Sequence, residues 1–177
     1  MVKLNTPINE EARLSLRAGD RVTITGTIYT GRDAAHQLMV QTARDMGSLP
    51  FDFTGALIYY TGPTPAQPGM PIGACGPTSS YRMDKFSLEL MPLGLKIMLG
   101  KGPRGKEFRA ALVANGAVYL VVTGGIGALL SQRVRAAQVI AYEHLGAEAV
   151  YRLEVVDFPA TVAYDALGNE IFADHQD

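Results

Sequence analysis

The sequence has a single cysteine, no excess of either charge and no long apolar run, and each shortage excludes a class of protein. Cys75 alone cannot form an intrachain disulfide or bind an iron–sulfur cluster or zinc ion through several thiolates. The formal net charge is −1, without the basic excess expected of a nucleic-acid-binding protein. No stretch reaches the roughly 18 apolar residues of a membrane span. Residues 1–11 contain no apolar core of a signal peptide, so we expect a cytoplasmic protein.

The length and the apolar content predict one well-packed domain. The chain has 177 residues, of which 47% are hydrophobic, a composition typical of a globular core rather than of a disordered segment. We find no internal repeat and no linker, and we therefore expect residues 1–177 to form a single domain.

Strand and helix patterns alternate through the centre of the chain. Short runs rich in β-branched residues predict strands, and apolar residues spaced three or four apart predict helices. The predicted strands are 21–29, 56–61, 95–99, 117–122, 138–142, 151–158 and 161–164, and the predicted helices are 32–46, 78–91, 104–115 and 127–134. We also expect a long loop at 62–76, a turn at 165–169 and a frayed tail at 173–177. This pattern predicts an α/β domain with a mixed sheet or two sheets.

Three polar, glycine-rich segments fall between a predicted strand and a predicted helix. They are residues 30–36, 75–84 and 100–106. In α/β proteins this edge of the sheet is where ligands bind. Helix N-termini there also present free N–H groups that suit anions.

Four side chains of these segments could form a site for a small dianion. Pro77 suits the first turn of a helix, and on such a helix Thr78 and Arg82 would share one face. Arg32 and Lys101 add two further cations. The planar fork of arginine binds both oxygens of a carboxylate, and lysine adds a point charge. We expect these groups to converge on a dicarboxylate, although any one arginine could instead be an ion-paired surface residue.

Two glycine motifs resemble nucleotide-binding loops without completing them. Residues 100–106 match most of a phosphate-binding loop, but Glu107 stands where Ser or Thr would bind magnesium, and Pro103 lacks an N–H group. Residues 124–127 follow a predicted strand, but Leu130 replaces the last small residue of the dinucleotide fingerprint. We interpret this second motif as a structural turn or an oxyanion-type contact.

The remaining candidate ligands predict no metal site. His36, His144 and His175 have no metal-binding spacing. His36 lies one helical turn from Arg32, and we expect it to support the site, whereas Cys75 is most simply a small buried residue.

Six motifs occur in an order that resembles one enzyme family. They are GRDAAH (31–36), GPTSSYRMD (76–84), GKG (100–102), AVYL (117–120), YEHLGAEA (142–149) and VVDFP (155–159). Together they resemble the beta subunit of two-subunit class I fumarate hydratases and the C-terminal domain of the single-chain members. L(+)-tartrate dehydratase beta subunits share the pattern. The second motif is the most specific, and its Ser79 keeps a hydroxyl where the family often has a second threonine.

The resemblance implies a fold, a cofactor and a partner. The fold would be a swivelling β/β/α domain. The cofactor would be an oxygen-sensitive [4Fe-4S] cluster held by three cysteines of the alpha subunit or N-terminal domain, in an expected α₂β₂ assembly. This chain would itself bind no cofactor and no metal, and it would be inactive without the alpha subunit.

The resemblance also implies roles for individual residues. Arg32, Arg82 and Lys101 would bind the substrate carboxylates, and the Thr78 hydroxyl would take part in proton transfer or position the substrate. Gly31, Gly76, His36 and Asp84 would support these groups. The expected reaction is the reversible hydration of fumarate to L-malate. The alternatives are an L(+)-tartrate dehydratase beta subunit and a non-catalytic module that binds organic anions.

Overall fold

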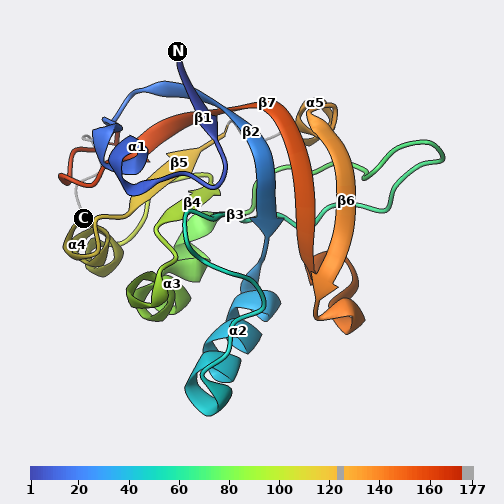
Figure 1. Cartoon of the computed structure of the whole chain (residues 1–177), viewed down its shortest axis with the longest axis horizontal. Helices are drawn as coiled ribbons and strands as arrows, with labels where there is room; N and C mark the ends of the chain where they lie inside the picture. Colours follow the sequence, from blue (N-terminus) through green and yellow to red (C-terminus); the bar gives the residue numbers. More distant parts are fainter. Residues whose placement is uncertain (123–125, 173–177) are drawn as a thin grey trace.

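Five parallel strands form the central layer of the structure (Figure 1). In the computed structural model, which describes residues 1–122 and 126–172, they lie side by side in the order β1 (Val2–Asn5), β2 (Arg21–Thr30), β3 (Leu57–Tyr59), β4 (Ile97–Gly100) and β5 (Val118–Val121). All residues of β3 and β4 are buried. Such continuous apolar strands are typical of a parallel sheet that is covered on both faces.

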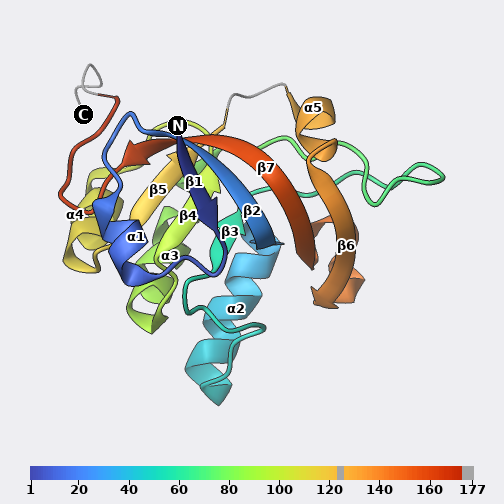
Figure 2. The ribbon, with the colours of Figure 1, turned by 45° about the horizontal axis from the view of Figure 1, so that its top comes forward.

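A long antiparallel strand forms a second layer over one face of this sheet. β7 (Val150–Tyr164) pairs with β2 along most of its length, and its end pairs with β5. β6 (Val134–Ala141) pairs with the first half of β7. Since β7 joins both β2 and β5, it closes β2 to β5 into a ring, and Figures 1 and 2 show it arching over the sheet.

Three helices cover the opposite face of the central sheet. They are α2 (Asp33–Met46), α3 (Asp84–Leu90) and α4 (Lys106–Ala114) (Figure 1). Shorter elements connect the layers: α1 (Glu10–Ser15), α5 (Gly127–Ser131), and the 3₁₀ turns η1 (Ser80–Met83), η2 (Met91–Leu93) and η3 (Glu143–Glu148). The order of layers is therefore β/β/α, as the family resemblance implied.

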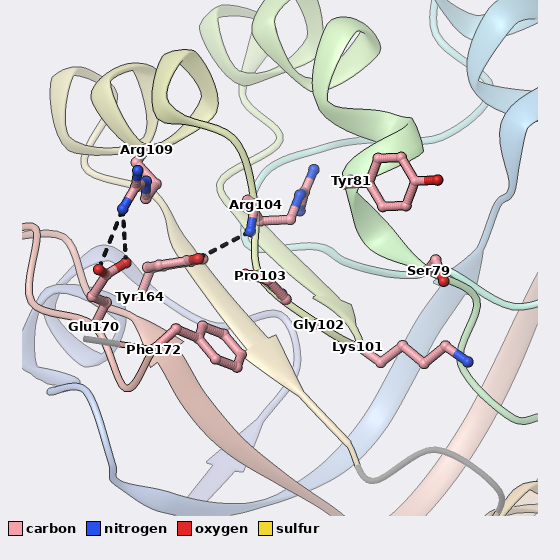
Figure 3. Close-up of a pocket in the computed structure, with 10 residues that line it drawn as sticks. All are labelled: Ser79, Tyr81, Lys101, Gly102, Pro103, Arg104, Arg109, Tyr164, Glu170 and Phe172. Carbon is pink, nitrogen blue, oxygen red and sulfur yellow. Dashed lines mark hydrogen bonds and ion pairs between the residues drawn. The ribbon is translucent and has the colours of Figure 1, made fainter. Parts of the chain in front are cut away.

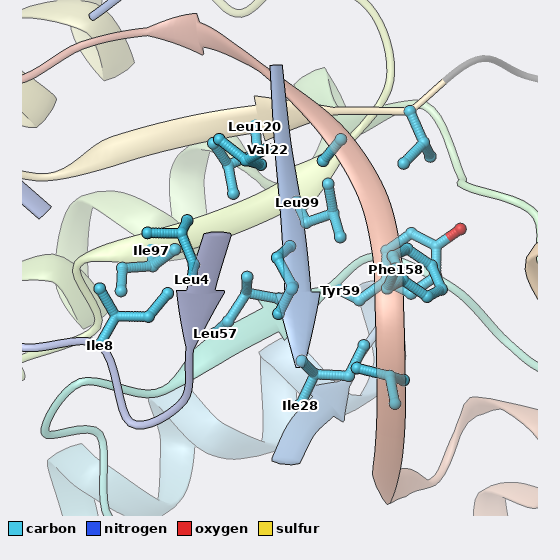
Figure 4. Close-up of a cluster of buried hydrophobic side chains, with 14 of the residues drawn as sticks. Leu4, Ile8, Val22, Ile28, Leu57, Tyr59, Ile97, Leu99, Leu120 and Phe158 are labelled. Atoms are coloured by element: carbon cyan, nitrogen blue, oxygen red, sulfur yellow. The ribbon is translucent and has the colours of Figure 1, made fainter. Parts of the chain in front are cut away.

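Alternating side chains of the central strands fill two separate cores. Leu57 and Tyr59 of β3 point into the core between the two sheets, where the Tyr59 ring packs edge-on against Phe158 (Figure 4). Ile58 and the following Tyr60 point into the core beneath the helices. This period of two is what a strand between two apolar layers requires.

Most of the predicted elements are confirmed, but one helix start, one helix-to-strand boundary and one strand break are wrong. The helix predicted at 127–134 ends at Ser131, and β6 begins at Val134 rather than at residue 138. The helix predicted from residue 78 begins only at Ser80, as the 3₁₀ turn η1. Thr78 lies before it, where its N–H group donates to the Tyr60 carbonyl at 2.7 Å. Pro77 and Thr78 are therefore not helical, and Thr78 does not share a helix face with Arg82. The hydrogen bond of Thr78 to Tyr60, directly after β3, therefore outweighs the local helical pattern of the sequence.

The two strands predicted at 151–158 and 161–164 are one continuous strand. Pro159 and Ala160 keep their register in β7, opposite Thr23 and Val22 of β2. The short elements β1 and α1 were not predicted, because each buries a single side chain, Leu4 and Arg13. The expectations for the tail at 173–177 and for Gly124 and Gly125 lie outside the described residues.

Candidate functional site

The carboxyl ends of β2, β3 and β4 meet at one edge of the central sheet. Gly31 follows β2, Thr61 follows β3, and Lys101 follows β4. Because these strands are parallel neighbours, the segments after them lie next to one another. The segment 75–84 reaches the same edge, because the Thr78 N–H donates to the Tyr60 carbonyl and Ser79 forms a β-bridge with Lys101. The edge predicted to bind a ligand therefore carries all three polar segments.

Arg32 lies at the start of α2 with a donor that has no hydrogen-bond partner. Its Nε is buried and makes no hydrogen bond within the described residues, and its nearest acidic group is Glu148 Oε1, at 3.6 Å. The side chain passes over Gly62, where a Cβ atom would stand 3.1 Å from Arg32 Cδ. A glycine at position 62 thus leaves room for the arginine.

His36 supports the backbone of Arg32 from within the first turn of the same helix. Its Nδ1 lies 2.8 Å from the Arg32 carbonyl, which can only accept a hydrogen bond, so Nδ1 carries the hydrogen. The ring is fully buried, and burial lowers the pKa of His36 to about 4. The ring also packs against its neighbour, since a Cβ on Gly31 would lie 3.3 Å from His36 Cε1. His36 and Gly31 therefore lie directly against Arg32, and their supporting role stays a prediction.

Arg82 is tied to the same helix start. Its guanidinium donates to Asp33 Oδ2 at 3.0 Å, and both side chains are about two-fifths exposed. Asp33 is the first residue of α2 and follows Arg32 directly. The structure therefore brings Arg82 into the neighbourhood of Arg32.

Lys101 is held by its backbone and extends a free ammonium group. Its N–H donates to Ser80 Oγ at 2.9 Å, and its carbonyl accepts from the Ser80 N–H at 3.2 Å. Gly100 leaves room for this contact, because a Cβ there would lie 1.9 Å from Ser80 Oγ. Within the described part of the chain, the Lys101 ammonium makes no hydrogen bond and no ion pair.

The three cations lie along one edge rather than inside one cavity. Lys101, Ser79 and Tyr81 line a cavity of about 400 Å³, which extends to Tyr164 and Phe172 (Figure 3). Arg82 lines a separate groove, with Tyr81 on the ridge between them. Arg32 lines neither. The expected convergence on a single pocket is therefore not present in this chain by itself.

Asp84 is paired inward, with a buried arginine that the sequence analysis did not single out. Its carboxylate accepts from Arg104 Nε and from the Gly105 N–H. The Arg104 side chain is fully buried and stacks on Phe108, 3.6 Å from the ring centroid. A buried arginine in a glycine-rich loop leaves no signal in the sequence, since exposed arginines are far commoner there.

Two backbone N–H groups of the segment that resembles a phosphate-binding loop, those of Arg104 and Gly105, already donate hydrogen bonds within the chain. The Arg104 N–H donates to the Tyr164 hydroxyl at 3.0 Å, and the Gly105 N–H donates to Asp84 at 2.8 Å. Nucleotide binding there is therefore not supported.

Gly76 and Cys75 pack against the start of α5. A Cβ on Gly127 would lie 2.6 Å from the Gly76 nitrogen, so the two backbones meet in close contact. Cys75 is buried, and burial raises the pKa of its thiol to about 12. Among residues 1–122 and 126–172, no group of three or more His, Cys, Asp or Glu side chains could hold a metal ion. No helix in those ranges is long and apolar enough to cross a membrane.

Comparison with known proteins gives a consistent set of relatives. The profile of the protein family described as Fumarase C-terminus matches residues 1–175. The chain is 38% identical to the anaerobic class I fumarate hydratase of Escherichia coli, over 97% of this chain and 32% of that protein. It is 36% identical to the mitochondrial fumarate hydratase 1 of Leishmania major, over 97% of this chain and 32% of that protein.

A further relative differs in its length. The chain is 37% identical to a Methanocaldococcus jannaschii protein provisionally named as an L(+)-tartrate dehydratase subunit beta, over 89% of this chain and 84% of that protein. The chain thus spans about a third of the length of the fumarate hydratases, but most of this shorter relative.

Proposed function

Because the chain belongs to the Fumarase C-terminus family, we propose that it is the beta subunit of a class I fumarate hydratase. Residues 1–177 would act as a single domain, and a cluster-bearing alpha subunit would complete the active site. The reaction would be the reversible hydration of fumarate to L-malate. The relative that this chain nearly spans carries the name of a beta subunit, which supports the division into two subunits.

The free ammonium group of Lys101 is the observation that carries this proposal. A lysine whose backbone is fixed on both sides, and whose charge has no partner in the described residues, is suited to bind an anion from outside the chain. The buried Nε of Arg32, which makes no hydrogen bond in those residues, is a second donor. A substrate carboxylate would satisfy both kinds of donor.

The two arginines would bind carboxylate in competition with acidic side chains of this chain. Arg82 is paired with Asp33 and Arg32 lies near Glu148, and all four side chains are between 33% and 40% exposed. Surface ion pairs of this kind contribute little free energy. A dianionic substrate can therefore exchange with them, or bind beside them, at low cost.

The cations would act on the charge that develops during the reaction. Adding water to fumarate, or removing it from malate, passes through a carbanion-like state whose charge spreads into the adjacent carboxylate. Fixed cations aimed at that carboxylate stabilise this state more than the ground state. When bound, the [4Fe-4S] cluster of the alpha subunit would supply Lewis acidity toward the hydroxyl or water.

Thr78 would lie beside the substrate at the end of β3. Its N–H donation to the Tyr60 carbonyl fixes the backbone, and the side chain is half-buried. A hydroxyl is a weak base, so proton transfer through Thr78 would need a neighbouring group of the alpha subunit. Positioning of the substrate is the simpler role.

A second candidate function is the dehydration of L-tartrate. The relative of which this chain covers 84% is provisionally named as a tartrate dehydratase subunit. The two substrates are both dicarboxylates, so the same cations would serve either one. The third candidate function is a non-catalytic module that binds organic anions, and the experiment has to distinguish it from the two enzymes.

An anaerobic assay tests these alternatives. The chain is assayed alone and then with the cluster-bearing subunit, on fumarate, L-malate and L-tartrate. Activity on fumarate and malate only in the mixture is the expected result. Activity on tartrate alone would keep the site but change the substrate. A stable complex with a loaded cluster and no turnover of any of the three would reject the proposal.

A further inference from the structure

The loop after β3 projects from the body of the molecule as an arm. We use this name for residues 62–76, which extend past α5 and β6 in Figures 1 and 2. Thr64 closes the arm near its base: its N–H donates to the Ala74 carbonyl, its carbonyl accepts from the Gly73 N–H, and its hydroxyl accepts from the Ala74 N–H. From this closure onward every residue from 64 to 70 is exposed.

The composition of the arm favours contact with another protein. It contains four prolines and no charged residue. Proline restricts the backbone, so a proline-rich segment loses little conformational entropy when it becomes fixed in a complex. Met70, near the tip, is 46% exposed, and methionine adapts its shape to an apolar partner. A long segment without helix or strand in a compact domain is often functional.

The base of the arm is joined directly to the candidate site. Ile72 and Cys75 are buried in the core, and the Cys75 N–H donates to the Gly127 carbonyl at 3.2 Å. The Thr61 hydroxyl donates to the Gly76 carbonyl at 2.7 Å. The next residues along the chain are Pro77 and Thr78. The base of the arm is therefore continuous with the edge that carries the cations.

We propose that the tip of the arm, residues 64–70, docks on the cluster-bearing subunit. This inference rests on the proposed function, because that subunit is the body expected to complete the site. The continuity of the arm with Thr78 favours this occupant over a second copy of the same chain. Because the arm is uncharged, its contribution to binding comes from apolar contact and depends little on salt.

The experiment compares two exposed methionines. Met70→Glu places a charge at the tip of the arm, and Met46→Glu is the matched control at the end of α2. A third variant replaces residues 65–70 by two glycines. Each variant is titrated anaerobically with the purified cluster-bearing subunit from the same organism. The dissociation constant is measured at low and at high salt, and turnover is measured at saturating subunit.

The expected result is a change in affinity without a change in chemistry. Met70→Glu and the shortened arm raise the dissociation constant at least tenfold at both salt concentrations, turnover at saturation stays within twofold of the parent, and Met46→Glu matches the parent. Equal affinities for all variants would overturn the proposal. A loss of self-association by Met70→Glu, seen in sedimentation with unchanged affinity for the subunit, would assign the arm to a second copy instead.

The parent chain separates a failure of the arm from a failure of the proposed function. Tight binding of the parent without turnover would reject the hydratase activity, but the affinities of the variants would still report on the arm. A parent that does not bind the subunit would reject both.

Discussion

Ser80 holds both backbone polar groups of Lys101. It accepts from the Lys101 N–H through Oγ at 2.9 Å, and its own N–H donates to the Lys101 carbonyl at 3.2 Å. Ser80 is fully buried at the start of η1, whereas the lysine side chain is partly exposed at the edge of the sheet. The position of the free ammonium therefore depends on a serine that cannot itself reach the solvent.

Ser80→Ala should weaken catalysis by the assembled enzyme. Removal of the hydroxyl leaves the Lys101 N–H without an acceptor, which should cost about 1–2 kcal/mol in the free energy of unfolding. A displacement of the ammonium by about 1 Å is expected to lower kcat/KM by about 10- to 100-fold. Steady-state kinetics and urea unfolding measure the two effects.

Ser131→Ala is the matched control for this variant. Ser131 is also buried, but among the residues that the structure describes its hydroxyl bonds only the Ala128 carbonyl of its own helix. It should lose some stability and keep kcat/KM. An unchanged kcat/KM in Ser80→Ala would show that the lysine does not need this bond.

Arg82→Ala should remove activity without unfolding the chain. Arg82 contacts Asp33 in a surface ion pair, and such pairs contribute about 0–1 kcal/mol to stability. If Arg82 binds a substrate carboxylate, its loss should lower kcat/KM by about two to three orders of magnitude, as the removal of a group that stabilises a developing anion does. Arg44→Ala breaks a comparable surface pair with Glu89 and should leave turnover unchanged. Near-normal turnover in Arg82→Ala would remove Arg82 from the site.

The periodic parts of the fold could be predicted from the sequence, whereas tertiary pairing could not. β3, β4 and β5 are apolar throughout, and α2 and α4 repeat apolar residues at helical spacing. These elements are recognisable because burial alone determines their pattern. The local sequence around Thr78 predicts a helix, but the Thr78 N–H pairs with the end of β3.

The candidate site was only partly predictable for the same reason. Residue type and a place between strand and helix are enough to propose Arg32, Arg82 and Lys101 as candidate binding residues. Lys101 and Arg82 line two different hollows that share Tyr81, and no local sequence pattern contains this separation. Arg104 was missed because its burial depends on Tyr60 and Tyr119, which are distant in the sequence, as well as on the nearby Phe108.

His36 should make the stability of the protein depend on pH below neutrality. Its pKa in the folded state is about 4, below the ordinary value of 6.5, because burial disfavours the charged ring. The contribution of the neutral ring to the free energy of unfolding is therefore complete above pH 6.5. It is lost as the pH falls from 6.5 toward 4, because in this interval the unfolded chain takes up the proton and the folded chain does not. The loss should be about 1.4 kcal/mol per pH unit across that window. Urea unfolding at pH 7, 5.5 and 4.5 measures it.

Two asparagine variants isolate this effect. In His36→Asn the new side-chain amide can still donate to the Arg32 carbonyl but has no proton to gain, so the slope of unfolding free energy against pH should fall. His144 is exposed, and His144→Asn should keep the parent slope. Equal slopes in the parent and in His36→Asn would assign the pH dependence to carboxylates.

Substitution of Arg104 should destabilise the fold strongly. Its guanidinium reaches Asp84, the Tyr60 hydroxyl and the Ser87 hydroxyl while it stacks on Phe108. Arg104→Met removes one partner of a largely buried pair, and a change of this kind costs about 3–5 kcal/mol. The loss arises because the Asp84 carboxylate, only 21% exposed, then keeps the Gly105 N–H as its remaining donor among the described residues.

The double variant Arg104→Met/Asp84→Asn tests that explanation. If the unpaired carboxylate causes the loss, neutralising it should recover a substantial part of the unfolding free energy that Arg104→Met loses, and the cycle should show coupling of more than about 1 kcal/mol. Arg44→Met, at an exposed surface pair, serves as the control and should lie within about 0.5 kcal/mol of the parent. Strictly additive losses in the double variant would mean that Arg104 stabilises the fold by packing on its aromatic shell, and that Asp84 contributes independently through the backbone of Gly105.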